Sequence, residues 1–384
     1  MKNIILLILE LFNNLTSLKT YKLCSGVLAV FITLSVQVHA STSNPYSDID
    51  RSLFVLPQSS AVSGSDFVFS HDGTSQTNPA NLAFDSVSEA SLAYAGFYQN
   101  TFSTSMLSYV TRIGKFSGIG FSIGYLYNPD ISNTENLNTV ENNSVIFPVY
   151  DSTLVYSITE SGIYFHAGYG LSYPITNNIT GAVGVGINAL RYSLSPYKAY
   201  GLGCDGGVAV DFHSTGLKTS LICENLTTNY TKWDKNYSET ALPHVRFGIG
   251  WKKEIPYIYG RIQVQFKTLD IMANEGVNAD STYDSSGISV VRPITKHFSK
   301  DPVYFLYNGT FGLEYTVMNT LSLRFGLPVG GSYDVSSDVS RFAFGCGLNL
   351  MHKKLSIDFS YLTHELAGTY QIGISYRWKS YSGQ

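Results

Sequence analysis

One histidine and one aspartate of this chain are candidates for catalytic residues. His166 and Asp205 both fall on the polar side of segments that alternate polar and apolar residues. Catalysis by a Ser/His or Asp/His group needs a nucleophile within hydrogen-bond reach of its base. No spacing in this chain singles out such a pair. We therefore expect that the protein is not an enzyme, and we assign no catalytic residue.

Metal and cofactor sites have equally little support in the sequence. The histidines are scattered, without a His-x-x-x-His pair or paired cysteine spacing. We interpret Cys204, Cys223 and Cys346 as small apolar residues of strands rather than as a disulfide or a metal site. We expect no cofactor and no metal. The net charge of −3 is too small to indicate a nucleic-acid partner.

The elements that carry these residues alternate with a period of two. Twelve short segments between Phe116 and Trp378 show this pattern, which is typical of strands. Charged residues make up 14% of the chain, against roughly 25% in typical soluble domains. Aromatic residues also reach 14%, led by 28 tyrosines, which suits a wall that faces lipid. The composition and the period predict an all-β, 14-stranded antiparallel transmembrane β-barrel.

The connections between the segments support a barrel of the outer-membrane type. Tight turns follow the even-numbered strands, and longer loops, such as 128–160, 226–242 and 270–302, follow the odd-numbered ones. Such barrels have short periplasmic turns and longer external loops. The predicted strands cover residues 89–98, 103–113, 116–127, 161–173, 179–193, 201–212, 216–225, 243–253, 257–269, 303–317, 320–329, 341–351, 354–362 and 369–378.

The two faces of the predicted strands differ in chemistry. A charge that faces lipid at mid-membrane costs about 2–4 kcal/mol, so the bilayer favours an uncharged outer face. The outward positions form uncharged sets of large apolar residues, such as Ile119, Phe121, Ile123 and Tyr125 or Val245, Phe247, Ile249 and Trp251. On the second strand the register is open, because Met106, Ser108 and Val110 compete with Leu107, Tyr109 and Thr111.

The inward face carries the charged residues together with many small ones. A soluble barrel would show the same alternation turned inside out, but its solvated face would carry more lysine and glutamate. Small residues suit a concave interior that a plug approaches closely. They include Gly118, Gly120, Ser122, Gly124, Gly184, Gly186, Gly345, Gly347, Ser356 and Ser360.

Residues 1–40 resemble an export signal. Lys19 and Lys22 precede the apolar run from Leu23 to Val36, and Val38-His39-Ala40 fits the small-residue cleavage rule. A misassigned start or an uncleaved anchor is the alternative. After Ala40 no stretch reaches the ~20 apolar residues that a spanning helix needs. We expect a protein of the bacterial outer membrane, with a barrel over residues 89–378 and a periplasmic tail at 379–384.

Residues 41–88 precede the first strand and predict a plug or hatch inside the barrel. Asn78 can cap a helix start and Pro79 suits the first turn, with Ala80, Leu82 and Ala83 as packing residues. A simple capped turn is the alternative interpretation of this plug motif.

The plug motif, followed by a fourteen-strand barrel, resembles the FadL/PorV/PorQ superfamily over about residues 51–378. Further matches are Glu224-Asn225-Leu226, the segment Leu242-Pro243 that leads into Arg246–Gly250, and the ending Tyr370–Trp378. Two features depart from the family pattern. Asn81 stands where a glycine is usual, and the expected glycine-rich stretch is reduced to Ser63-Gly64-Ser65.

The resemblance implies two functions, and we expect the chain to be closest to the PorV/PorQ type. Such a protein assists type IX secretion or surface assembly, with secreted proteins or secretion components as partners. The alternative is a FadL-like transporter with a hydrophobic ligand, which needs an apolar cavity near Asn78–Ala83. Few large apolar residues have inward parity, which favours the first function: Tyr164, Ile222, Tyr259 and Leu306.

Overall fold

The structure is a computed structural model. It describes residues 53–69, 76–85, 87–134, 153, 155–226, 229–234, 238–241, 243–272, 278–283, 289–294, 300–328, 342–363 and 367–379. The predicted export signal lies outside the described residues, as does the predicted tail apart from Lys379. Within the described part of the chain, no helix is long and apolar enough to cross a membrane.

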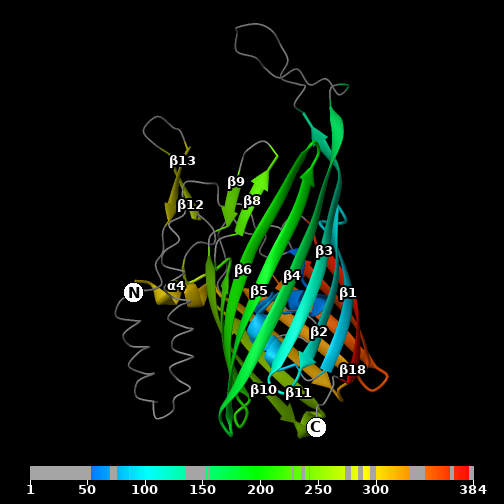
Figure 1. Cartoon of the computed structure of the whole chain (residues 1–384), viewed down its shortest axis with the longest axis vertical. Coiled ribbons are helices and arrows are strands. Elements are labelled where there is room, and N and C mark those ends of the chain that lie inside the picture. The colour runs from blue at the N-terminus through cyan, green and yellow to red at the C-terminus, as the bar shows by residue number, and fades with distance from the viewer. Residues whose placement is uncertain are drawn as a thin grey trace.

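Fourteen strands form one closed antiparallel sheet, which confirms the predicted barrel (Figure 1). Each strand of the barrel pairs with the next one along the chain, and β1 pairs with β18 to close the ring. The barrel strands are β1 (Val87–Phe97), β2 (Phe102–Ile113), β3 (Ser117–Asn133), β4 (Tyr156–Thr176), β5 (Ile179–Leu194), β6 (Tyr197–Phe212), β7 (Leu217–Glu224), β10 (His244–Ile255), β11 (Gly260–Lys267), β14 (Thr310–Val317), β15 (Leu321–Pro328), β16 (Phe342–Leu350), β17 (Leu355–Thr363) and β18 (Thr369–Lys379).

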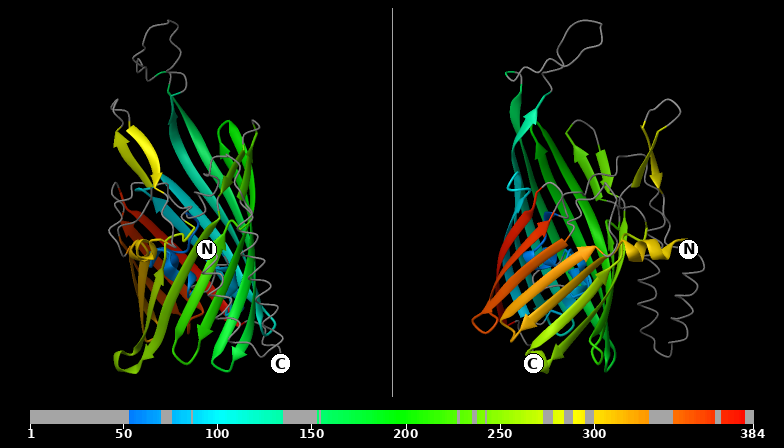
Figure 2. Two further views of the ribbon diagram at one scale, coloured as in Figure 1. Left: turned by 90° about the vertical axis from the view of Figure 1, so that its left-hand side faces the viewer. Right: turned by 180° about the vertical axis from the view of Figure 1, so that it is seen from behind.

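The wall of the barrel is tall on one side and low on the other (Figures 1 and 2). Strands β3 to β6 contain 16 to 21 residues each, whereas β14 to β17 contain eight or nine. The short turns gather at one end of the barrel, which we call the turn end. The longer connections gather at the opposite end, the loop end, as the loop parity predicts.

Two of the predicted loops contain strands of their own. The hairpin of β8 (Asn229–Trp233) and β9 (Ser238–Ala241) extends the sheet beside β6. A second hairpin, β12 (Asn278–Tyr283) and β13 (Ser289–Ile294), forms a separate two-stranded sheet. Both hairpins lie at the loop end (Figure 1).

Two predicted strands begin in a helix or a 3₁₀ turn instead. The predicted strand 303–317 begins in α4 (Pro302–Tyr307), where Pro302 opens the helix and Asp301 caps it by accepting a hydrogen bond from the backbone N of Tyr304 at 3.3 Å. A short apolar run does not distinguish helix from strand, so the cap and the proline decide here. The predicted strand 257–269 begins in the 3₁₀ turn η6 (Pro256–Ile258), and β11 starts only at Gly260.

The outer surface of the barrel is apolar. On β3, Phe121, Ile123 and Tyr125 are 41%, 49% and 45% exposed, while Ser122 and Gly124 between them are buried. The same alternation settles the register of β2, where Met106, Ser108 and Val110 point inward and Leu107 points outward. Apolar side chains at this exposure over a closed sheet need lipid around them. The chain is therefore an outer-membrane-type β-barrel.

Lipid contact predicts a depth-dependent effect of charge along β3. Ile123 pairs with Leu107 of β2, which pairs with Leu92 at the middle of β1. Replacing Ile123 with arginine should lower the free energy of unfolding by about 2–4 kcal/mol. Replacing Tyr127, nearer the loop end on the same face, should lower it by only about 0–1 kcal/mol. Urea titration of the protein in lipid vesicles measures both values. Equal effects at the two positions would contradict lipid contact along this face.

Candidate functional site

The segment before β1 lies inside the barrel and follows the inner wall (Figure 2). Its helix α3 (Pro57–Ala61) packs against β15 to β18, and the 3₁₀ turn η2 (Ser65–Phe67) packs against β11 and β14. The 3₁₀ turn η3 (Pro79–Ala83) packs against β2 to β6. These elements are buried throughout. Residues 53–69 and 76–85 therefore form a plug that fills the middle of the lumen.

The plug motif forms η3 and its cap. The backbone of Asn78 is extended, and its Oδ1 accepts a hydrogen bond from the backbone N of Ala80 at 3.0 Å. Pro79 opens the turn, and Ala80, Leu82 and Ala83 are almost fully buried. Asn81, which departs from the family pattern, donates from Nδ2 to the carbonyl oxygen of Phe67 at 2.7 Å. This bond joins the two halves of the plug, a role that the sequence did not reveal.

Inward glycines of the wall allow the plug to approach the sheet closely. A Cβ atom at Gly170 of β4 would lie 2.6 Å from the carbonyl oxygen of Pro79 and 2.9 Å from the backbone N of Ala83. Real Cβ atoms do not approach backbone atoms so closely. Glycines on other strands face plug atoms in the same way: Gly118, Gly124, Gly184, Gly207, Gly248, Gly312, Gly326, Gly345 and Gly373. Of the small inward residues identified in the sequence, Gly118, Gly124, Gly184 and Gly345 seat the plug, whereas a Cβ at Gly186 or Gly347 would meet side chains of the wall.

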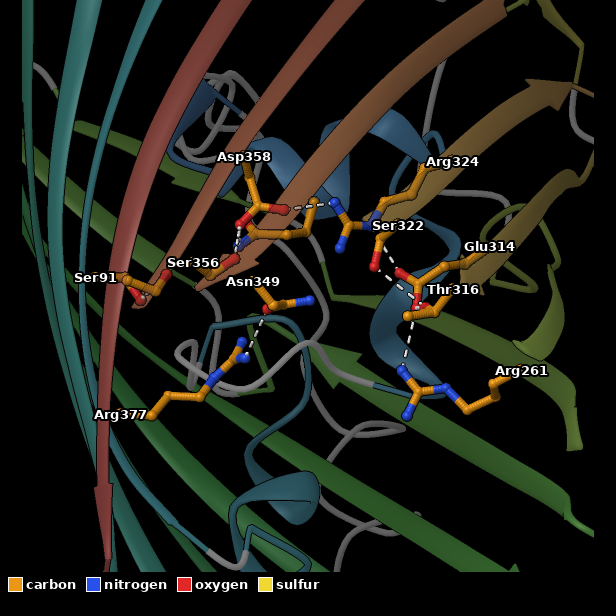
Figure 3. A network of polar contacts seen from close by, with 12 residues as sticks. Ser91, Arg261, Glu314, Thr316, Ser322, Arg324, Asn349, Ser356, Asp358 and Arg377 are labelled. Atoms are coloured by element: carbon orange, nitrogen blue, oxygen red, sulfur yellow. Dashed lines mark hydrogen bonds and ion pairs between the residues drawn. The ribbon is translucent and has the colours of Figure 1, made fainter. Parts of the chain in front are cut away.

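A buried ionic network ties α3 to the wall, and we call it the polar latch: Gln58, Glu314, Arg324, Ser356 and Asp358 (Figure 3). The guanidinium of Arg324 donates from Nε to Glu314 Oε2 and from Nη1 to Asp358 Oδ1, both at 2.6 Å. The other oxygen of Asp358 accepts from Gln58 Nε2 at 2.8 Å and from Ser356 Oγ at 2.5 Å. The latch therefore links the plug to β14, β15 and β17.

A second ion pair lies at the seam where the first and last strands meet. Arg377 Nε of β18 donates to Glu89 Oε2 of β1 at 2.6 Å, and Arg377 Nη1 donates to Asn349 Oδ1 at 3.3 Å. Ser91 Oγ donates to the other oxygen of Glu89 at 3.1 Å. These bonds fix the closing strand pair of the barrel.

The structure brings His166 and Asp205 together, although the sequence offered no reason to pair them. Their side chains are fully buried, with 3.6 Å between His166 Nε2 and Asp205 Oδ2. Asn188 on the intervening strand β5 donates to Asp205 Oδ2 at 2.9 Å and accepts from Tyr164 Oη at 2.7 Å. The only available signal was the inward parity of these residues on β4 and β6. Because the pair is sealed and bonded to the wall, we interpret it as part of the wall.

The possible metal ligands of the chain are its His, Cys, Asp and Glu side chains. Among the described residues, no group of three or more His, Cys, Asp or Glu side chains is placed to hold a metal ion. Within the described part of the chain, Cys204, Cys223 and Cys346 form no disulfide.

Apolar side chains pack between the plug and the wall on the loop-end side of the plug motif. This loop-side apolar cluster consists of Phe54 and Leu56 of the plug with Ala93, Met106, Leu126 and Tyr164 of the wall. The rings of Phe54 and Tyr164 stack with centroids 5.5 Å apart. Four partly buried residues pack around the cluster: Leu53, Phe102, Leu190 and Tyr192.

This cluster corrects the predicted set of inward apolar residues. Tyr164 and Ile222 are buried as expected, at 2% and 1% exposure. Tyr259 and Leu306 are 71% and 46% exposed, because the first lies in a tight turn and the second in α4. Met106 and Leu126 are inward instead, and both pack in the loop-side apolar cluster.

The cavity beside the plug motif is polar and opens at the turn end. Its volume is about 790 Å³, and it borders Asn81 and Phe84 of the plug. Most of its lining comes from charged and polar residues of the wall and turns, including Lys218, Lys252 and Glu314. A carrier was expected to have an apolar cavity near Asn78–Ala83. The cavity found there is lined mainly by polar and charged residues instead.

We compared the chain with protein families, curated proteins and solved structures, and only solved structures were similar to it. No protein-family model and no curated protein matched the chain. Toluene transporter TodX of Pseudomonas putida is 14% identical, with 85% of this chain and 98% of that chain covered and a TM-score of 0.48. Toluene transporter TbuX of Ralstonia pickettii is 11% identical, with the same coverage and a TM-score of 0.44. A FadL homologue of Pseudomonas aeruginosa is 10% identical, with the same coverage and a TM-score of 0.42.

These structures are likenesses of fold alone. The expected closeness to PorV/PorQ stays a prediction.

Proposed function

We propose that this protein carries hydrophobic small molecules across the outer membrane. The observation that carries the proposal is the loop-side apolar cluster, in which Leu126 and Tyr164 of the wall meet Phe54 of the plug. A hydrophobic molecule gains roughly 25 cal/mol for each Å² of apolar surface that leaves water. The cluster is buried between plug and wall, so an apolar ligand reaches Leu126 and Tyr164 only when it replaces their contacts with Phe54 and Leu56 of the plug.

The plug blocks the path of a ligand through the lumen. It contacts the wall from β2 to β6 and from β11 to β18, and it separates the apolar cluster from the polar cavity at the turn end. A molecule that crosses must therefore displace part of the plug. Phe54 and Leu56 belong to both the plug and the cluster, so a ligand that replaces their contacts also loosens the plug.

The polar character of the turn-end cavity counts against a binding site at Asn78–Ala83 itself. Asn81 and Phe84 border that cavity together with lysines, arginines and serines. The proposed ligand site is therefore on the other side of the plug motif, at Leu126 and Tyr164.

Uptake of a radiolabelled aromatic hydrocarbon by cells tests the proposal. A strain without the gene should take up less of it than one that carries the wild-type gene. Leu126→Gln places an amide in the apolar cluster, which costs about 1–3 kcal/mol. That range includes a tenfold weaker binding of an apolar ligand, so we expect roughly a tenfold loss at limiting hydrocarbon.

The matched control is Ser122→Ala, which changes another inward side chain of β3 outside the cluster. It should leave uptake unchanged. Equal uptake by the deletion strain and the wild-type strain would contradict the proposed function.

Assistance to secretion, as in PorV/PorQ, is the second candidate. The observation that favours it is the pair of hairpins β8–β9 and β12–β13 at the loop end, which offer backbone edges to a partner. Deletion of the gene should then leave exported cargo in the periplasm. Normal export in the deletion strain would remove this candidate.

A further inference from the structure

The lumen contains a cavity at the turn end. The proposed hydrophobic ligand binds elsewhere, at the loop-side apolar cluster, so this cavity has no role in recognising that ligand. It lies between the plug and the short turns and opens away from the loop end. Its lining includes seven lysines and arginines but only three aspartates and glutamates, together with two histidines. Low-dielectric walls around such a lining concentrate its electric field. The cavity therefore attracts negative charge.

Two of the three carboxylates of the cavity lie beside its arginines and histidines. Glu314 accepts from Arg324 at 2.6 Å and lies 3.5 Å from Arg261. Asp211 lies 3.5 Å from His213. Glu89 and Asp358 lie outside the lining, but they pair with Arg377 and Arg324 of the lining. Counting these two carboxylates makes the net charge of the cavity less positive, but it stays positive.

Two exposed lysines stand at the rim of the cavity. Lys353 and Lys354 form the turn between β16 and β17, both are exposed, and neither pairs with a carboxylate in the described part of the chain. They lie on the opposite side of the cavity from Lys218 of β7, because about half of the ring separates β7 from β17. One small anion cannot contact both sides at once. An extended ligand with several negative charges can.

The lining also contains aromatic surface. Phe69 and Phe84 of the plug and Trp378 of β18 border the cavity, and Lys218 Nζ lies 4.1 Å from the centroid of the Phe84 ring. Basic and aromatic groups together suit a peptide that carries acidic and apolar side chains. The wall separates this space from the bilayer, so a lipid headgroup does not reach it from the membrane.

We propose that the turn-end cavity is a docking site for an acidic segment of a periplasmic protein. The proposal is independent of the hydrophobic ligand at the loop end. An acidic segment that enters the cavity meets the rim lysines first and then the underside of the plug at Asn81 and Phe84. The cavity of about 790 Å³ holds a short peptide rather than a folded domain.

Peptide binding to the full-length protein in an uncharged detergent tests the proposal. The probe is a short fluorescent peptide of glutamate, glycine and phenylalanine, and its matched control contains lysine in place of glutamate. Fluorescence anisotropy should show binding of the acidic peptide alone, with affinity that falls as salt rises. Equal binding of both peptides would overturn the proposal.

Variants locate the site. Lys353→Glu together with Lys354→Glu should weaken binding of the acidic peptide roughly tenfold or more, as rim charges act on association and salt dependence. The control changes Lys115 and Lys253, two exposed turn-end lysines outside the cavity lining, to glutamate. The control carries the same change in net charge and should bind like the wild type.

Two further outcomes would overturn the proposal. Equal weakening in both double variants would show non-specific charge attraction. Complete displacement of the peptide by inorganic phosphate, compared with chloride at the same ionic strength, would show a site for a small anion only. Hydrocarbon uptake should be unchanged in the Lys353/Lys354 variant, which separates this test from that of the carrier function.

Discussion

Replacing Gly170 with valine should displace the plug and open the lumen. A Cβ at this position already lies 2.6 Å from the carbonyl oxygen of Pro79, and the two methyl groups of valine add to the overlap. Overpacking of this kind costs about 1–3 kcal/mol. Such a penalty shifts the balance between seated and displaced plug by roughly 5- to 150-fold. Conductance in planar lipid bilayers should rise accordingly.

Gly162→Ala is the matched control for this prediction. Gly162 is another glycine of β4 at inward parity, but a Cβ there meets only ordinary contacts, the nearest at 3.4 Å from the ring of Tyr192. This variant should conduct like the wild type. A Gly170→Val protein that folds and stays closed would contradict the close seating of η3 on β4.

Loss of the Arg324 guanidinium should destabilise the folded protein strongly. Arg324→Leu leaves the carboxylates of Glu314 and Asp358 buried without their main counter-charge, since both accept from Arg324 at 2.6 Å. Removing one partner of a buried ionic pair typically costs about 3–5 kcal/mol. Urea titration in lipid vesicles should show a decrease of this size in the free energy of unfolding.

If unpaired charge causes the instability of Arg324→Leu, then neutralising Glu314 and Asp358 should reverse it. Adding Glu314→Gln and Asp358→Asn to Arg324→Leu removes the unpaired charges and should recover most of the lost stability. If the triple variant is as unstable as the single variant, packing around Arg324 rather than charge determines the effect. A decrease of under about 1 kcal/mol in the single variant would contradict the buried latch.

The last three strands of the barrel were predicted from sequence almost to the residue. The predicted ranges 341–351, 354–362 and 369–378 compare with β16, β17 and β18 at Phe342–Leu350, Leu355–Thr363 and Thr369–Lys379. Lipid on one face and a packed lumen on the other enforce alternation along the whole strand, so the signal is strong. It fails at Val303–Leu306, where a short apolar run belongs to α4.

The site was predictable only where its interactions are local. The cap of Asn78 on Ala80 spans two residues, and the sequence indicates it directly. The bond from Gln58 to Asp358 spans 300 residues, and it depends on the register of every strand between them. The loop-side apolar cluster was missed for a similar reason, because the register of β2 at Met106 was ambiguous in the sequence.

Photolabelling inside the barrel tests the proposed carrier function most directly. A small hydrocarbon with a diazirine group is added to the protein in lipid vesicles and activated by light, and mass spectrometry locates the adducts. The account predicts labelling at Leu126 and Tyr164 of the loop-side apolar cluster, and competition there by excess unlabelled hydrocarbon. Labelling of Ile123, which faces lipid on the same strand, should resist this competition. Adducts confined to outward residues such as Ile123 would contradict a hydrophobic ligand in the lumen.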